Sequence, residues 1–207
     1  MAQRSPKKPA KAAGIRFNAT LLRPAGKSVS WTFLAMPKET KLPSRGMVSV
    51  QGTFNDAPFQ ATFEPDGEGG HWLKVDRKLR EAARVEVGDT VTLEVAPVAV
   101  EDEPEPKVPP DLRKALAGAS KGAREVWADI TPIARRDWIQ WITSGKRAET
   151  RGLRIEKACD MLAKGKRRPC CFDRSGMFDK SLSCPIADDA CDAPRDSGRS
   201  AKVQHPE

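Results

Sequence analysis

Residues 69–95, with the sequence GGHWLKVDRKLREAARVEVGDTVTLEV, decide the fold of the first half of this chain of 207 residues. The apolar run at 72–75 predicts a strand, and Asp76 behind it is the predicted N-cap of a short helix that extends to Ala83. Gly88 and Asp89 then form a turn, after which apolar residues alternate with polar ones up to Val95. Such alternation is typical of a strand with one buried face, so this part of the chain is predicted to be mainly β-structure.

The same alternation occurs three times upstream of this segment. The predicted buried positions are Ile15, Phe17, Ala19 and Leu21 in the first strand, Val29, Trp31 and Phe33 in the second, and Val48, Val50 and Phe54 in the third. The turn residues Asn-Asp-Ala-Pro at 55–58 predict a hairpin between the third strand and a fourth at 59–63. Short strands separated by such turns predict a small closed barrel or a sandwich over residues 15–98.

The apolar period changes after an acidic, proline-rich segment at 99–110, which is predicted to be an extended linker. Beyond it, apolar residues recur at helical spacing and predict a helical domain over 111–169. Its four predicted helices lie at 112–119 with Asp111 as the cap, around 123–129, from Thr131 and Pro132 to Gly145, and from Thr150 as the cap to Gly165. The predicted fold class is therefore α+β.

The two ends of the chain are predicted to be irregular: a basic disordered arm at 1–14 and a tail at 170–207 that contains four of the five cysteines. No apolar run is long enough to cross a membrane and the N-terminus has no apolar signal segment, so we expect a soluble, cytoplasmic protein. The odd number of cysteines and the adjacent pair Cys170 and Cys171 fit neither a disulfide framework nor a zinc site. We expect free thiols, no metal and no cofactor, and we interpret Cys159 as a core residue.

Two stretches carry a resemblance to known families. Residues 69–95 resemble the end of a domain family of unknown function whose members fold as double-split β-barrels similar to the AbrB/MazE group. The sequences VPPDLRKAL at 108–116 and KRAETRGLRIEKACDMLAKGKRRP at 146–169 resemble the helical YdeI/OmpD-associated family, which is also labelled bacteriocin-protection. The resemblance implies a double-split barrel followed by a small helical domain, an association with stress or bacteriocin resistance, and a possible homodimer. It implies no reaction.

The search for a catalytic group finds only two histidines, His71 and His205, and neither belongs to a recognisable motif. The sequence therefore predicts a protein without enzymatic activity, and His71 is explained more simply as a histidine in a turn or on the barrel surface. If a ligand site exists, its candidate residues are His71, Trp72, Glu149, Thr150, Arg151 and Arg154. The simpler interpretation of the last four is a helix start with a solvated charged face.

The net charge of +8 is concentrated near the end of the helical domain, where residues 145–168 contain nine basic and three acidic side chains. Such clusters supply phosphate contacts, so the candidate nucleic-acid-binding residues are Arg147, Lys157, Lys164, Lys166, Arg167 and Arg168. Three hypotheses remain open: a binding or stress-response protein with an unknown ligand or protein partner, a nucleic-acid-binding regulator, and an enzyme of unrecognised type that uses Glu149, Arg151, Arg154 and His71.

Overall fold

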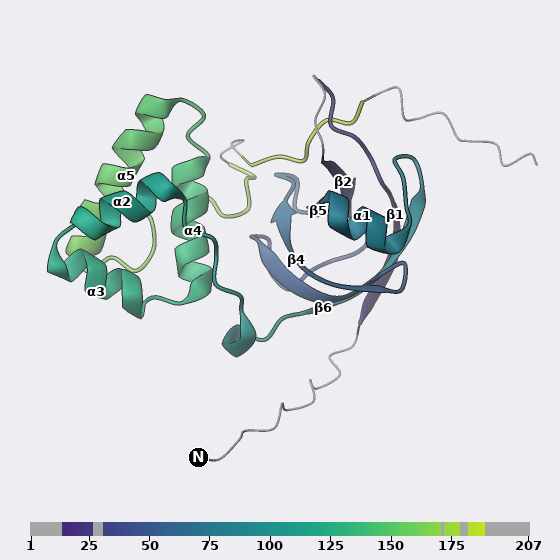
Figure 1. Cartoon of the computed structure of the whole chain (residues 1–207), viewed down its shortest axis with the longest axis horizontal. Helices are drawn as coiled ribbons and strands as arrows, with labels where there is room; N and C mark the ends of the chain where they lie inside the picture. Colours follow the sequence, from purple (N-terminus) through teal and green to yellow (C-terminus); the bar gives the residue numbers. More distant parts are fainter. Residues whose placement is uncertain (1–13, 27–30, 171, 179–181, 189–207) are drawn as a thin grey trace, which may run out of the picture.

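A computed structural model describes residues 14–26, 31–170, 172–178 and 182–188 of the chain. It shows a nearly closed antiparallel barrel of six strands beside a group of helices (Figure 1). The strands are β1 (Ile15–Thr20), β2 (Thr32–Ala35), β3 (Val48–Phe54), β4 (Ala57–Pro65), β5 (His71–Val75) and β6 (Thr90–Pro97), and they pair in the order β1-β6-β3-β4-β5-β2. The predicted α+β class, with a barrel before a helical domain, is confirmed.

The ring of strands is nearly closed by the backbone just after β1. Leu22 and Phe33 exchange two backbone hydrogen bonds, of 2.7 and 2.9 Å, and so connect this segment to β2 at the other end of the sheet. The predicted hairpin joins β3 to β4, with Asn55 and Asp56 both at positive φ, 44° and 65°. A two-residue turn of this kind matches the right-handed twist of the strands, and asparagine and aspartate tolerate it well.

The interior of the barrel contains most of the predicted apolar positions. It is lined by Phe17, Ala19, Leu21, Leu34, Met36, Leu42, Val48, Val50, Phe54, Phe63, Leu73, Val75, Val85, Val91, Leu93 and Val95. The short helix α1 (Arg77–Ala83) covers one part of this core, and the Asp76 carboxylate accepts the backbone N–H of Leu79 at 2.8 Å. The predicted N-cap is therefore confirmed.

The predicted inward face of β2 is wrong by one residue. Leu34 belongs to the barrel core, and since successive strand residues point to opposite faces, Phe33 lies on the outer side. Phe33 is nevertheless 1% exposed, because it packs edge-on against Trp72 with ring centroids 6.3 Å apart. Thr32, which the pattern makes an exposed polar residue, is also buried. When both faces of a strand are buried, apolar and polar residues no longer alternate along it, so the sequence does not show which face points inward.

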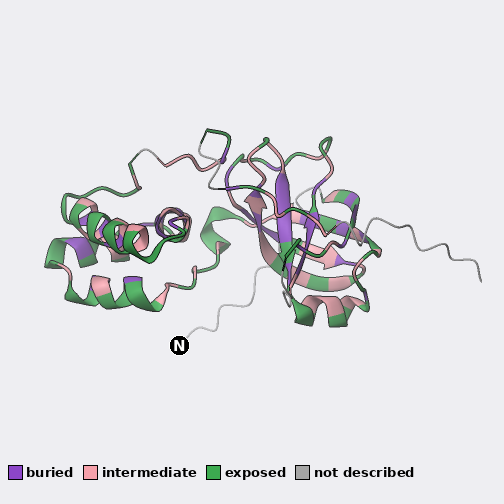
Figure 2. Cartoon of the chain, turned by 90° about the horizontal axis from the view of Figure 1, so that it is seen from above, coloured by how far each residue is buried: buried purple, intermediate pink, exposed green. Residues whose placement is uncertain are grey.

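The second half of the chain contains the helices α2 (Pro110–Gly118), α3 (Lys121–Asp129), α4 (Pro132–Thr143) and α5 (Ala148–Ala163). They enclose a core of their own, in which Trp138, Ile142 and Leu162 are fully buried (Figure 2). Thr131 caps α4 as predicted, with its hydroxyl oxygen 3.3 Å from the backbone nitrogen of Ala134. The same core contacts the partly buried Cys159, which confirms its interpretation as a core residue.

Two of the predicted helix caps are wrong. Asp111 and Thr150 lie inside the first turns of α2 and α5, whose N-cap residues Pro109 and Arg147 make no side-chain capping bond. In place of a cap, the Asp111 carboxylate accepts hydrogen bonds from Arg151 at 2.5 and 3.0 Å. The carboxylate that the local sequence assigns to capping thus forms an ion pair between α2 and α5.

The barrel and the helices are connected by two passages of chain. The first contains the short 3₁₀ helix η1 (Val100–Asp102) and leads into α2. The second follows α5 and returns to the barrel (Figure 1), where the backbone of Ala25 and Asp188 donates to Ile186 and Arg23 at 2.7 and 2.8 Å. Residues 172–178 and 182–188 are irregular, as predicted for this part of the tail, yet they lie against the barrel.

Candidate functional site

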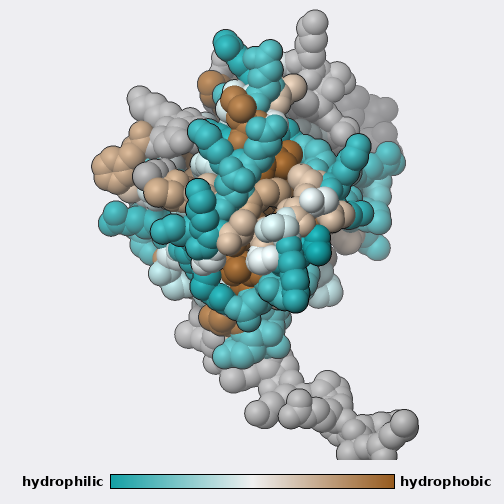
Figure 3. All heavy atoms as spheres, turned by 90° about the vertical axis from the view of Figure 1, so that its left-hand side faces the viewer, coloured by the Kyte–Doolittle hydropathy of each residue, from teal (hydrophilic) through white to brown (hydrophobic). Residues whose placement is uncertain are grey.

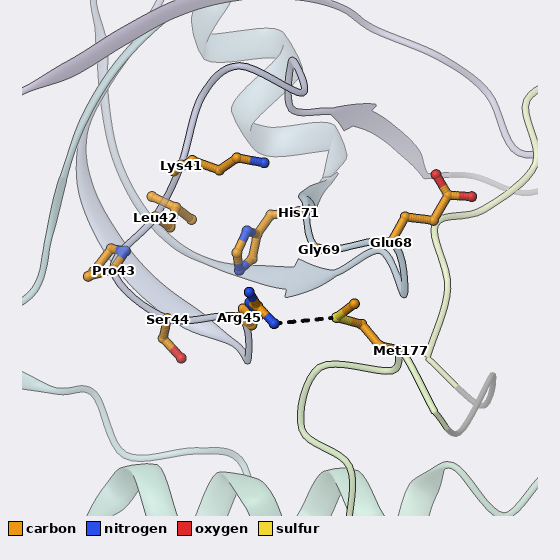
Figure 4. Close-up of a pocket in the computed structure, with 9 residues that line it drawn as sticks. All are labelled: Lys41, Leu42, Pro43, Ser44, Arg45, Glu68, Gly69, His71 and Met177. Carbon is orange, nitrogen blue, oxygen red and sulfur yellow. Dashed lines mark hydrogen bonds between the residues drawn. The ribbon is translucent and has the colours of Figure 1, made fainter.

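A pocket of about 440 Å³ opens at one end of the barrel, and Figure 4 shows the side chains around it. Its wall is formed by the segment that leads from β2 to β3, by the turn between β4 and β5, and by the returning chain after α5. The lining residues are Lys41, Leu42, Pro43, Ser44, Arg45, Glu68, Gly69, His71 and Met177. The volume lies in the lower part of the range for sites that bind small molecules.

His71 forms the floor of this pocket. It is the first residue of β5, lies on the same strand face as Leu73 of the barrel core, and is only 3% exposed. Its Nε2 atom lies 3.0 Å from the backbone oxygen of Gly46, so this nitrogen donates a hydrogen bond and the ring orientation is fixed. Burial lowers the pKa of His71, against opposing contributions from this bond and from Asp66, so the imidazole is neutral at pH 7. The prediction of a turn or surface histidine is wrong.

Two cationic side chains flank the imidazole. Lys41 lies above it and Arg45 below it in Figure 4. Among the described residues, neither has a carboxylate within ion-pair distance, and the contact recorded for the Arg45 guanidinium is a weak one with the Met177 sulfur at 3.9 Å. The carboxylate of Glu68 points away from His71 in the same view and lies 4.0 Å from Lys38. The centre of the pocket is therefore positively charged.

The wall of the pocket depends on the chain that returns after α5. Met177 reaches the pocket from this chain, while the side chain of Arg174 lies within 3.3 Å of where a Cβ on Gly46 would be. Arg174 also donates to the carboxylate of Asp137 on α4 at 3.1 Å, and Arg168 donates to the other oxygen. The helical domain thus fixes the segment that supplies Met177 to the barrel pocket.

A buried ion pair connects the two domains close to the pocket. Arg136 of α4 donates to Glu103 of the linker and, at 2.7 Å, to the Ser49 hydroxyl of β3. The same guanidinium donates to the backbone oxygen of Met47 at 3.1 Å. The side chains of Arg136 and Glu103 are 12% and 5% exposed. Glu105, whose side chain is exposed, pairs with Arg135, so the acidic linker is attached to α4 through two successive arginines.

The structure separates the candidate ligand residues into different places. His71 and Trp72 are neighbours on a strand and point to opposite faces, so they do not share a site. Trp72 packs outside the barrel against Trp31, with ring centroids 6.4 Å apart, and its indole nitrogen is buried with no hydrogen-bond partner among the described residues. The other four candidates lie at the start of α5 in the helical domain.

The candidates on α5 are occupied by structural contacts. Arg151 forms the bidentate pair with Asp111 and thereby lowers the pKa of that carboxyl to about 2. Arg154 donates to the backbone oxygen of Trp141 and the hydroxyl of Ser144, at 2.5 and 2.6 Å, at the C-terminal end of α4. Glu149 is exposed and Thr150 half-buried in the first turn. The structure assigns Arg151 and Arg154 to helix packing.

The candidate nucleic-acid residues are spread from the start of α5 to the chain that follows it. Arg167 pairs with Asp129, and Arg168 pairs with Asp137. Of the exposed remainder, Arg147 precedes α5, Lys157 lies within it, and Lys164 and Lys166 follow it. A helix of 16 residues is about 24 Å long, so the two ends of the group are far apart. Figure 3 shows hydrophilic side chains over much of the outer face of the helical domain, with small apolar areas between them. Nucleic-acid binding stays a prediction.

The pocket residues that sequence reasoning missed lie in irregular segments. Lys41, Arg45 and Met177 belong to no strand or helix, so neither a period nor a motif identifies them. Arg45 and Met177 are 132 positions apart, and only the folded chain brings them together. The one local signal is the pair Gly69 and Gly70 before His71, which permits the tight turn that exposes the end of β5 to the pocket; φ of Gly69 is 91°.

The described residues contain no group of three histidine, cysteine or acidic side chains placed to hold a metal ion. Burial, followed by the nearby Asp66 and Glu68 carboxylates, raises the pKa of the Cys184 thiol to about 11, so this thiol is protonated at neutral pH. Cys171, Cys191 and His205 lie outside the described residues. Over the same residues, no helix is both long and apolar enough to span a bilayer.

We expect His71 to make the protein less stable in mild acid. The unfolded chain has a histidine pKa near 6.5 and the folded chain a lower one, so between these values the unfolded state binds more protons. The contribution of the neutral His71 to the free energy of unfolding is therefore fully present above about pH 6.5, and it is lost progressively as the pH falls below that value. Urea unfolding of wild type and His71→Gln at pH 7.5, 6.5 and 5.5 will show a smaller loss in the variant, whose amide can still donate to Gly46. Equal losses in both proteins would contradict the assignment.

A small antiparallel barrel, a helical domain attached to it by the buried ion pair of Arg136 and Glu103, and a pocket at the barrel end define a two-domain barrel-and-helix protein. Residues 17–95, within the barrel, match the family described as a domain of unknown function (DUF1905). Residues 105–165, which contain the four helices α2 to α5, match the family described as Bacteriocin-protection, YdeI or OmpD-Associated. The helical domain is thus similar to the YdeI/OmpD-associated family, and the barrel in front of it is similar to the DUF1905 family. No curated protein matches it.

Proposed function

We propose that the protein binds a small molecule in the barrel pocket and that it acts by binding, without chemical conversion of the ligand. The observation that carries this proposal is the buried, oriented His71 at the floor of a pocket whose walls come from the barrel and from the chain that returns after α5. A polar group fixed at the base of a concave, partly apolar space is the usual arrangement in ligand sites. The ion pairs of Arg136 and Asp137 support it, because they hold the wall in place before a ligand arrives.

The match to a bacteriocin-protection family supports a role in resistance to such agents. We propose that this role depends on the occupied pocket and that the protein acts in the cytoplasm. The location is testable by fractionation of cells that express the untagged protein. Recovery of the protein in a periplasmic or membrane fraction would contradict it.

The binding proposal is tested by filling the pocket. Met177 lines it from an irregular segment, and Phe178 beside it is 92% exposed and does not line it. A thermal-shift and NMR screen of small acidic, basic and neutral compounds should give ligands for the wild type. We expect Met177→Trp to weaken them at least about tenfold, since its larger side chain occupies the pocket, and Phe178→Trp to leave them unchanged.

Two outcomes would contradict this proposal. A screen without ligands, or ligands that bind Met177→Trp as tightly as the wild type, would show that the pocket is not a binding site. NMR spectra of each ligand after long incubation with the protein test the second part of the proposal. We expect the ligand signals to persist unchanged, and the appearance of product signals would show that the protein is an enzyme.

A further inference from the structure

We propose that the ligand of the barrel pocket is a small organic anion, with a carboxylate or phosphate group held between Lys41 and Arg45 and a short apolar body against Leu42, Pro43 and Met177. This inference rests on the proposed function and names the chemical class of the ligand at that site.

The charges around the pocket favour an anion over a cation. Lys41 and Arg45 line the pocket without a carboxylate partner in the described parts of the chain, so their donors are available to a ligand. A guanidinium can hold a carboxylate or phosphate through two parallel hydrogen bonds, and the ammonium adds a point charge. A cationic ligand would instead meet two like charges. Glu68 is the one carboxylate in the pocket lining with which a cationic ligand could pair, and it points away from His71 and lies beside Lys38.

The remaining acidic group near the floor is also engaged elsewhere. One oxygen of Asp66 accepts the backbone N–H groups of Glu68 and Gly70, at 2.7 and 2.9 Å, and so stabilises the turn between β4 and β5. Asp66 does not line the pocket. His71 adds no charge, since its ring is neutral and donates to Gly46 through Nε2. The charged groups that line the ligand space without an ion-pair partner in the described residues are therefore the donors Lys41 and Arg45.

The apolar part of the lining indicates that the rest of the ligand, beyond its anionic group, is apolar. Leu42 is buried against the barrel core, Pro43 lies next to it, and the Met177 thioether closes the opposite side. Methionine is flexible and adapts to the shape of what it contacts. A volume of about 440 Å³ accommodates a short chain or a single ring and excludes a large ligand.

Four probes with the same six-carbon alkyl body and different head groups test the inference: heptanoate, hexyl phosphate, hexylammonium and hexanol. We expect at least one of the two anions to bind the full chain at least about tenfold more tightly than hexanol or hexylammonium in NMR titrations at pH 7.5. Lys41→Ala and Arg45→Ala should each weaken that anion about five- to tenfold. Arg45→Lys, which keeps the charge but loses the planar fork, should retain part of the affinity.

The matched control is Lys78→Ala, which removes one positive charge from an exposed residue of α1 that does not line the pocket. It should change the affinity for the anion by less than twofold. If both anions fail to bind, or if Lys78→Ala weakens them as much as Arg45→Ala, the inference is overturned. Binding of hexanol or hexylammonium that Met177→Trp abolishes would then still support the pocket as a ligand site, whereas a pocket that takes no compound of any charge would end both proposals.

Discussion

Glu103→Ala is expected to destabilise the protein by about 3 kcal/mol, because it leaves the guanidinium of Arg136 buried without its counterion. Arg136 is already incompletely satisfied: its Nε atom is buried with no hydrogen-bond partner among the described residues. The variant also removes the acceptor of the Ser49 hydroxyl, 2.6 Å away. Urea unfolding at pH 7, followed by circular dichroism, measures the loss, and amide hydrogen exchange shows whether β3 and α4 lose protection first.

A double variant separates a requirement for charge from a requirement for packing. Arg136→Met with Glu103→Leu replaces the pair by apolar side chains, and we expect it to be more stable than Glu103→Ala alone, since no unpaired charge remains buried. The control is the exposed pair of Arg77 and Glu81 on α1, whose replacement by alanines should change the unfolding midpoint little. A Glu103→Ala protein with the wild-type midpoint would show that this pair does not hold the two domains together.

Gly52→Ala is expected to cost about 3 kcal/mol or more, or to prevent folding of the barrel. Gly52 lies in β3 opposite Val95 of β6, and a Cβ atom there would stand 1.9 Å from the backbone oxygen of Glu94. The obstacle is backbone in the middle of a strand, so no side-chain movement relieves it. Gly52 also pairs with Phe59 of β4 on its other side, so β3 and β6 would have to separate in the interior of the sheet.

The matched control for this prediction is Gly118→Ala. Gly118 is the last residue of α2, and a Cβ there meets no atom within 4 Å, so the alanine should leave stability unchanged or raise it by up to about 1 kcal/mol. Thermal unfolding compares the two variants, and the soluble yield serves if Gly52→Ala does not fold. A Gly52→Ala protein that melts within about 2 °C of the wild type would show that β3 and β6 are not this close.

Much of the fold follows from local sequence signals. The strands of the barrel other than β2, the hairpin turn at Asn55 and Asp56, and the caps at Asp76 and Thr131 are each encoded within a few neighbouring residues. Such signals are readable because they depend on local backbone geometry alone. The cap assigned to Asp111 fails, since a carboxylate that satisfies a cap equally satisfies an arginine from another helix. The cap assigned to Thr150 fails because α5 already begins at Ala148.

The sequence by itself determined that a barrel precedes a helical domain, because the period of its apolar residues changes from two to that of a helix between them. Only the tertiary structure decided where a ligand can bind. His71 is buried and its ring is oriented by a bond to Gly46, a residue 25 positions away. Lys41, Arg45 and Met177 beside it come from irregular segments without an apolar period. The position of the linker likewise depends on a tertiary contact, the ion pair between Glu103 and Arg136 of α4. Contacts between irregular segments far apart in the chain leave no pattern in the sequence, and it is these contacts that form the pocket.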